Sequence, residues 1–326
     1  MPKNNKLKKV GNIYFSNNVA LSKNQKITAD AFAHMWKNSF PYDNPRKSEI
    51  KSSYDLSNNL YPKWIAKYFR SLGSKKIKFL DVGCGYGYGF KVFFSKYISQ
   101  IKYIGIDIHS ELPKTYKFLN KLFLKRGESP IIVNATMNKI PNIKLFRNID
   151  FAWAEGTLHH SESVDSAIQQ LSKTLKKNGL FMFWIINEQK PVRKVTDSFF
   201  RNYFQSYPSS NRAMKELRKI AYLSRAFGKS LGDDKVVLKS KIESLQIEPG
   251  IYSLQRILYD YIIKLYYYNK SVSIERITHQ LFDWFKPANY EQTNRNKLKK
   301  ILKKNNLRII HYLEKVNGHH VVCKKF

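Results

Sequence analysis

The stretch Ile77-Lys-Phe-Leu-Asp-Val-Gly-Cys-Gly-Tyr-Gly-Tyr-Gly89 decides the fold. Its first six residues are mostly apolar, as expected of a strand that is buried on both faces of a sheet. The glycines that follow permit a sharp turn and a close approach of the backbone to a ligand. Apolar residues then recur at helical spacing from Phe90 to Ile98, so a helix begins here with unpaired N–H groups. The stretch predicts half of a βαβ unit with a ligand-binding turn.

A second strand is expected over residues 101–107, and it ends at Asp107. This residue follows the turn by about 20 positions, where such folds place a carboxylate on a ribose hydroxyl. An adenosine-like ligand is therefore expected. The dinucleotide pattern G-x-G-x-x-G fails, because Tyr88 or Phe90 stands at its last position. Asp81 instead stands two residues before the first glycine, where its charge would repel a pyrophosphate but suits a cationic amine.

The order Asp-x-Gly-x-Gly-x-Gly resembles the first motif of the class I S-adenosylmethionine (SAM) methyltransferases of the UbiE-like group. The resemblance implies SAM as cofactor, with Asp81 and the glycine loop at its methionine end and Asp107 on its ribose. It also implies an α/β fold, with a Rossmann-like seven-stranded doubly wound sheet whose last strand is antiparallel. The alternative is a glycine turn that only packs a helix on a strand.

The expected cofactor contacts lie where the first four strands end. They are Asp81, Gly83, Cys84, Gly85, Gly87, Asp107, Ile108, Asn134, Thr136, Met137 and Glu155. The family usually has an acid after the third strand, whereas this chain reads Asn-Ala-Thr-Met there. Asn134 or Thr136 can still accept a hydrogen bond from the adenine amino group, and Met137 can pack on the ring.

The catalytic candidates follow the fourth strand, expected over residues 149–155, in the order Glu155-Gly-Thr-Leu-His159-His160. The carboxyl edge of an open α/β sheet is where ligands bind. A histidine with a pKa of about 6.5 can take a proton at cellular pH. We expect His159 or His160 to act as the base, and Glu155 to orient the acceptor or a histidine. The alternative is that the histidines only support the conformation of the loop. The methyltransferase family that the chain resembles frequently has Leu-His-His at this position.

Four segments are expected along the chain: an N-terminal arm and helical cover (1–75), a SAM-binding core (76–187), a helical insertion over the acceptor (188–288) and the rest of the core sheet (289–326). Residues 1–27 are rich in Lys and Asn and read as a loose arm. Phe32 and Trp36 resemble a stretch that covers the cofactor in a bacterial subgroup of the family, or form one face of a core helix. Residues 257–268 read as core packing rather than as a membrane-surface helix. His319 and His320 read as structural.

The formal net charge is +34, and its excess is mostly Lys spread over the whole chain. A positive charge spread over the whole chain indicates non-specific binding of anions rather than a specific nucleic-acid site. With two cysteines and no metal-ligand spacing, neither a disulfide framework nor a metal site is expected. The sequence shows no signal peptide and no transmembrane run, so a cytoplasmic protein is expected, with peripheral membrane contact left open.

The first hypothesis is an enzyme that moves the methyl group of SAM onto an oxygen or nitrogen of a small molecule such as a sugar, lipid or metabolite. Two alternatives stay open. One is an RNA methyltransferase, which needs a basic groove with stacking aromatics beside the cofactor. The other is a SAM-binding interaction module without catalysis. The sequence leaves the acceptor and the oligomeric state open.

Overall fold

The computed structural model describes residues 7–16, 21–37, 61–124, 127–140, 143–265, 270 and 272–326. The chain divides into two compact units. Unit 1 comprises residues 1–37, 54–187 and 289–326. Unit 2 comprises residues 188–288 together with 38–53, and the latter lie outside the described residues.

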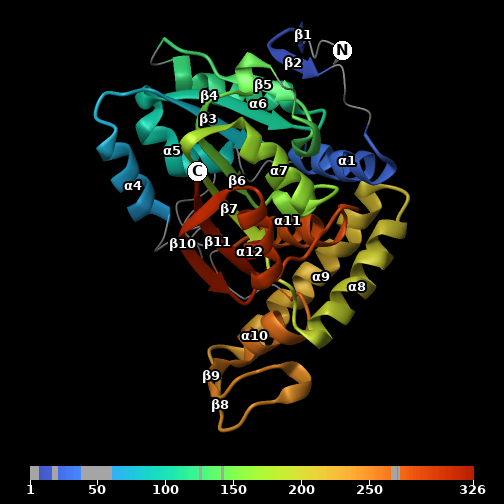
Figure 1. Ribbon diagram of the computed structural model, residues 1–326. Coiled ribbons are helices and arrows are strands. Elements are labelled where there is room, and N and C mark those ends of the chain that lie inside the picture. The colour runs from blue at the N-terminus through green and yellow to red at the C-terminus, as the bar shows by residue number, and fades with distance from the viewer. Residues whose placement is uncertain are drawn as a thin grey trace. The chain divides into compact units, whose positions relative to one another are not determined.

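Unit 1 is built on a nine-stranded sheet in the order β1-β2-β5-β4-β3-β6-β7-β11-β10 (Figure 1). Its strands are β1 (Leu7–Val10), β2 (Ile13–Ser16), β3 (Ile77–Val82), β4 (Ile101–Asp107), β5 (Ile131–Asn134), β6 (Ile149–Glu155), β7 (Leu175–Ile186), β10 (Leu307–Lys315) and β11 (Gly318–Lys325). Neighbouring strands from β2 to β7 pair in parallel, whereas β11 pairs antiparallel with both β7 and β10. The stretch from β5 to β10 is the predicted doubly wound sheet, and β11 is its antiparallel last strand. The predicted fold class is confirmed.

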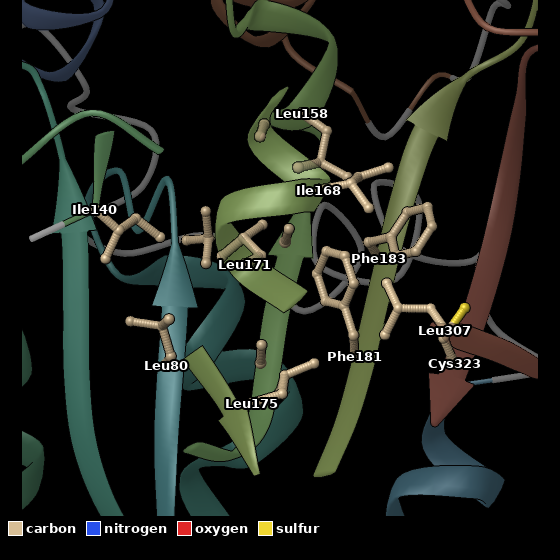
Figure 2. Close-up of a cluster of buried hydrophobic side chains, with 14 of the residues drawn as sticks. Leu80, Ile140, Leu158, Ile168, Leu171, Leu175, Phe181, Phe183, Leu307 and Cys323 are labelled. Atoms are coloured by element: carbon tan, nitrogen blue, oxygen red, sulfur yellow. The ribbon is translucent and has the colours of Figure 1, made fainter. Parts of the chain in front are cut away.

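Alternate side chains of each strand point to opposite faces of the sheet, and both faces are buried. On β3, Leu80 and Val82 belong to one core cluster and Phe79 to the other. The first cluster is completed by α7 (Val164–Thr174) and α12 (Arg295–Lys304), and Figure 2 shows Ile168 and Leu171 of α7 within it. The second is completed by α4 (Tyr61–Ser71), α5 (Tyr88–Phe94) and α6 (Leu112–Phe123).

Aromatic rings dominate the second cluster, directly beneath the start of the glycine loop. Phe79 of β3 stacks on Phe151 of β6, with 5.3 Å between ring centroids. Phe79 also meets Phe94 of α5 edge-on at 4.8 Å. Such pairs add to the free energy gained by burying the rings alone. The strand and helix on either side of the loop are therefore fixed to each other.

The N-terminal arm contains a β-hairpin, and its last residues belong to helix α1 (Lys23–Lys37), so the expectation of a loose arm over residues 1–27 is wrong for residues 7–16 and 23–27. Val10 pairs with Ile13, which leaves Gly11 and Asn12 as a two-residue turn. Gly11 has φ of +58°, the left-handed conformation that a tight hairpin turn needs at its first position. β2 then pairs in parallel with β5, and Ile13 is buried in the second cluster. Apolar burial and sheet pairing therefore order residues 7–16, half of which are apolar or aromatic, within an arm that is otherwise rich in Lys and Asn.

Unit 2 is mainly helical and has its own core. Its elements are α8 (Pro191–Ser206), α9 (Ser210–Leu231), β8 (Lys235–Leu238), β9 (Gly250–Ser253), α10 (Leu254–Ile257), the π-helical turn η7 (Leu258–Ile262) and α11 (Ile274–Phe285). Both α8 and α9 contact α11. Inside this unit, Arg193 forms a buried 2.7 Å ion pair with Asp197, which also accepts a 2.9 Å hydrogen bond from Trp284 Nε1. In the described part of the chain, no helix has the length and apolar character needed to cross a bilayer.

Candidate active site

In the glycine loop between β3 and α5, two positions have no room for a side chain. Gly83 and Gly85 have φ of +67° and +49°, in the left-handed region that favours glycine. A Cβ on Gly83 would lie 2.0 Å from Thr157 Oγ1, and one on Gly85 would lie 2.9 Å from the ring of Trp36. Both positions therefore require glycine, for conformation and for space.

The end of β4 holds this loop through backbone hydrogen bonds. Gly83 N and Cys84 N donate to the carbonyl oxygen of Ile106, at 2.8 and 3.1 Å. Gly85 N donates to Asp107 Oδ2 at 2.8 Å. Burial raises the pKa of the Cys84 thiol, so this side chain packs as a neutral group. The first two strand ends thus form one rigid support.

Asp107 lies at the end of β4 with both carboxylate oxygens engaged by the backbone. Oδ1 accepts from Ile108 N at 2.7 Å, and Oδ2 accepts from Gly85 N. Its side chain keeps 13% of its surface exposed. Oδ1 also accepts from His109 N at 3.4 Å, whereas Oδ2 keeps a second lone pair, so Asp107 can still accept from a hydroxyl group of a ligand.

Asp81 lies on β3, just before the glycine loop, and is hydrogen-bonded to Tyr103 of β4. It is 3% exposed, and Tyr103 donates its hydroxyl hydrogen to Asp81 Oδ2 at 2.8 Å. Burial raises the pKa of Asp81 to about 7, against the opposing effect of the Tyr103 hydrogen bond and with a further contribution from Asp107. The predicted contact of Asp81 with a cationic amine stays a prediction, and Tyr103 is its partner in the structure.

Asp81→Asn is expected to remove a pH dependence of stability. The pKa of Asp81 is raised from 3.8 in the unfolded chain to about 7 in the folded protein. The contribution of Asp81 to the free energy of unfolding is therefore greatest below pH 3.8 and is lost as the pH rises to 7. The asparagine oxygen still accepts from Tyr103 but carries no charge. The variant should therefore exceed wild type in free energy of unfolding by up to about 4 kcal/mol above neutral pH, at about 1.4 kcal/mol per pKa unit.

Urea unfolding of both proteins at acidic and slightly alkaline pH checks this expectation. Near pH 4 the two free energies of unfolding should lie close together. An equally steep decline with pH in wild type and variant would assign the titration to another group.

A narrow cavity of about 30 Å³ lies at the carboxyl edge of the sheet. Among the residues that line it are six of the predicted site residues: Gly83, Asp107, Ile108, Thr136, Met137 and His160. Gln25, Ile106, Ala135 and Ser161 complete the lining. The ends of β3, β4 and β5 and the turn after β6 thus converge on one space. Ligand pockets usually measure roughly 300–1,000 Å³, so elements around this cavity must separate to admit a nucleoside.

Helix α1 (Lys23–Lys37) lies across this cavity. Gln25 Nε2 donates to Thr136 Oγ1 at 3.2 Å, and the ring of Phe32 meets His160 edge-on at 5.0 Å. Trp36, one turn further on, lies against Gly85. The two aromatic residues singled out in the sequence therefore contact site residues. Gln25 carries no sequence signal, because only the folded chain brings it to Thr136.

The residues after β5 face the end of β4. Asn134 pairs with Asp107 across the two strands, and Asn134 Nδ2 lies 3.4 Å from the Asp107 carbonyl oxygen. Thr136 Oγ1 accepts from Asn138 N at 3.4 Å in addition to Gln25. These contacts place Asn134 beside the Asp107 backbone, and Thr136 and Met137 at the cavity.

The structure distinguishes the two histidines after β6, which the sequence treats alike. His160 lines the cavity, and its Nδ1 lies 3.0 Å from the carbonyl oxygen of Asn289. Because a carbonyl only accepts, Nδ1 carries the hydrogen and the neutral ring has its lone pair on Nε2. His159 is buried, with its ring perpendicular to that of Trp184 at 5.4 Å. Glu155 ends β6, where it pairs with Trp184 of β7.

His319 and His320 have the structural surroundings that the sequence indicates. Nε2 of His319 lies 2.8 Å from the carbonyl oxygen of Thr293, and its Nδ1 lies 2.7 Å from the Tyr312 hydroxyl. Burial lowers the pKa of both histidines, to about 4 for His320. In the part of the chain that the structure describes, no cluster of three or more His, Cys, Asp or Glu could hold a metal ion.

The sequence model of a family described as "Methyltransferase domain" matches residues 80–183. Among solved structures, the magnesium protoporphyrin IX methyltransferase of Synechocystis PCC 6803 with bound SAH is similar, with a TM-score of 0.50, 9% identity and coverage of 93% of this chain and 100% of that chain. The same protein with bound SAM is similar with a TM-score of 0.48 and 10% identity, and the match covers 95% of this chain and 100% of that chain. The 1,6-didemethyltoxoflavin-N1-methyltransferase of Burkholderia thailandensis is similar with a TM-score of 0.43 and 10% identity, and the match covers 94% of this chain and 92% of that chain. No curated protein sequence matches the chain significantly. At these identities the likeness to solved structures concerns the fold alone.

Proposed function

We propose that residues 80–183, which match the family described as "Methyltransferase domain", form a class I SAM-dependent methyltransferase domain, and that the chain transfers the methyl group of SAM to an oxygen or nitrogen of a small molecule. The observation that carries the proposal is the cavity at the carboxyl edge of the sheet. The carboxylate of Asp107, the backbone of Gly83 and the imidazole of His160 all line this cavity. This combination suits an adenosine-containing cofactor with a proton acceptor beside it.

The residues around the cavity match the chemistry of SAM. Asp107 supplies a carboxylate for the ribose hydroxyls, and Ile108 and Met137 supply apolar surface for the adenine ring. Gly83 and Gly85 add no side chain at the proposed methionine end, where Thr157 and Trp36 now lie against them and would have to move to admit the ligand. SAM supplies a methyl group on a sulfonium, which is already a good leaving group. The protein therefore has to align the acceptor and exclude water.

His160 is proposed as the base. Its Nδ1 is held by the carbonyl of Asn289, which directs the lone pair of Nε2 to receive a proton from the acceptor hydroxyl or amine. Glu155 is proposed to orient the acceptor or a histidine. His160 is only 5% exposed, and such an enclosed base favours a small acceptor over a large folded nucleic acid. A sugar or a lipid-linked precursor fits this requirement. That the insertion at 188–288 covers the acceptor stays a prediction from chain order.

A transfer assay with methyl-labelled SAM tests the proposal. The full chain is incubated separately with a small-molecule cell extract and with total RNA, and labelled products are separated from free cofactor. Label should enter the small-molecule fraction and should depend on intact His160. Label confined to RNA would establish the nucleic-acid alternative instead. Binding of SAM without label in any fraction would indicate an interaction module.

A further inference from the structure

Unit 2 exposes more large apolar side chains than its share of the chain. The described residues include thirteen such side chains, and eight of them belong to unit 2. Six lie on α8 and α9, and the other two, Val237 and Ile251, face each other on β8 and β9. Scattered exposed apolar residues are ordinary, whereas a grouped set marks an interaction surface.

Helix α8 carries an apolar stripe on its outer side. Val195, Phe199 and Tyr203 follow each other at one-turn spacing and are 70%, 63% and 44% exposed. Arg193 and Asp197, on the opposite side of the helix, are buried. The buried side therefore holds α8 in unit 2, and the stripe has no part in that packing.

Helix α9 continues this surface. Tyr222, Leu223 and Phe227 are 54%, 49% and 44% exposed. A short turn after Ser206 joins α8 to α9, and both helices rest on α11 (Figure 1). The last residue of the α8 stripe, Tyr203, lies in the final turn of α8, next to this connection. We call these six side chains of α8 and α9 the α8–α9 face.

Positive charge surrounds the α8–α9 face. The exposed charged residues of α9 are all basic: Arg212, Lys215, Arg218, Lys219 and Lys229. Lys219 pairs with Glu216, and Arg218 pairs with Glu275 of α11. Within the described residues no ion pair is recorded for Arg212, Lys215 or Lys229. The face therefore combines apolar side chains with uncompensated cations.

We propose that the α8–α9 face docks unit 2 on an anionic phospholipid bilayer. Interfacial helices bury Phe, Leu and Tyr side chains at the boundary between headgroups and acyl chains, while Lys and Arg reach the anionic headgroups. Val195 and Leu223 favour a bilayer over RNA, because single-stranded nucleic acid binds by stacking on aromatic rings and Arg. In the stretch 257–268, where the sequence left a membrane-surface helix as the alternative to core packing, Tyr259, Tyr261 and Leu265 are buried, and residues 266–268 lie outside the described residues.

Vesicle co-sedimentation of the full chain tests the proposal. Vesicles of phosphatidylcholine with phosphatidylglycerol should bind the protein, and vesicles of phosphatidylcholine alone should bind it at least tenfold more weakly. Phe199→Ser should weaken binding about tenfold, because one fully buried large apolar side chain is lost. Leu124→Ser is the matched control, since Leu124 is 60% exposed and lies in unit 1. It should bind as wild type does.

A second pair of variants tests the charge. Lys215→Gln combined with Lys229→Gln should weaken vesicle binding about 25-fold, at about fivefold for each lysine. Lys299→Gln on α12 is the control and should have little effect. Melting curves establish that each variant is folded.

Three results would overturn the proposal. The first is no binding to anionic vesicles, or equal losses in the variants and their controls. The second is a concentration-dependent dimer that Phe199→Ser dissociates while vesicles remain unbound, which would assign the face to a second copy. The third is salt-sensitive RNA binding through this face without vesicle binding.

Discussion

Replacing Asp107 with alanine should lower the affinity for SAM by about 100-fold while the protein stays folded. A charge-assisted hydrogen bond contributes about 1.5–3 kcal/mol, and the variant loses those to the ribose. It also loses the carboxylate that holds Gly85 N and Ile108 N, so the glycine loop loses one support. Isothermal titration with S-adenosylhomocysteine measures the change.

Asp165→Ala provides the control for this titration. Asp165 is a partly exposed carboxylate on α7 that pairs with Lys304 of α12, away from the residues that line the cavity. Its removal should leave cofactor affinity within twofold of wild type. A folded Asp107→Ala protein with unchanged affinity would remove Asp107 from the ribose site.

His160→Ala should reduce turnover by roughly 10²–10⁴-fold, the contribution of a positioned general base. Cofactor affinity should change only a few-fold, because the assigned role of His160 concerns the acceptor. His159→Ala is the neighbouring comparison, since His159 packs against Trp184 and is not among the residues that line the cavity. Rates and cofactor affinity are measured for each folded variant with labelled SAM.

The reverse order of effects would contradict the assignment. If His159→Ala abolishes transfer and His160→Ala keeps most of it, the base is His159. If both variants retain wild-type rates at saturating acceptor, alignment alone carries the reaction and the histidines only brace the loop.

The central strands could be predicted from sequence because they are buried on both faces. The runs at 77–82, 101–107 and 149–155 are continuous and apolar, and the structure forms β3, β4 and β6 with these same bounds. A parallel sheet brings the carboxyl ends of its strands to one edge. The convergence of Asp107, Thr136 and His160 on one cavity follows from that rule.

A local sequence signal is ambiguous where the same dipeptide occurs in two kinds of backbone structure. From sequence, Asn178-Gly179 predicts the end of the helix that carries Val164 and Leu171 and the start of the fifth strand at Gly179, but α7 ends at Thr174 and β7 already begins at Leu175. Asn178 has φ of +66° inside β7, where the pairing with β6 is irregular. An Asn-Gly pair suits either a helix end or an irregular strand, because both need a left-handed residue.

Contacts between distant segments have no sequence signal. Tyr103 reaches Asp81 because the register of β3 and β4 places Asp81 opposite Gly105, two residues along the same face from Tyr103. Gln25 reaches Thr136 only because α1 lies across the site. Such contacts depend on tertiary packing, so spacing along the chain cannot reveal them.

Calorimetric titration of the purified full chain with S-adenosylhomocysteine and, separately, with NAD tests the central claim most directly. The account predicts saturable binding of S-adenosylhomocysteine at one site per chain, with a matching rise in melting temperature by mass action, and no binding of NAD. Tight binding of NAD without binding of S-adenosylhomocysteine or SAM would contradict it.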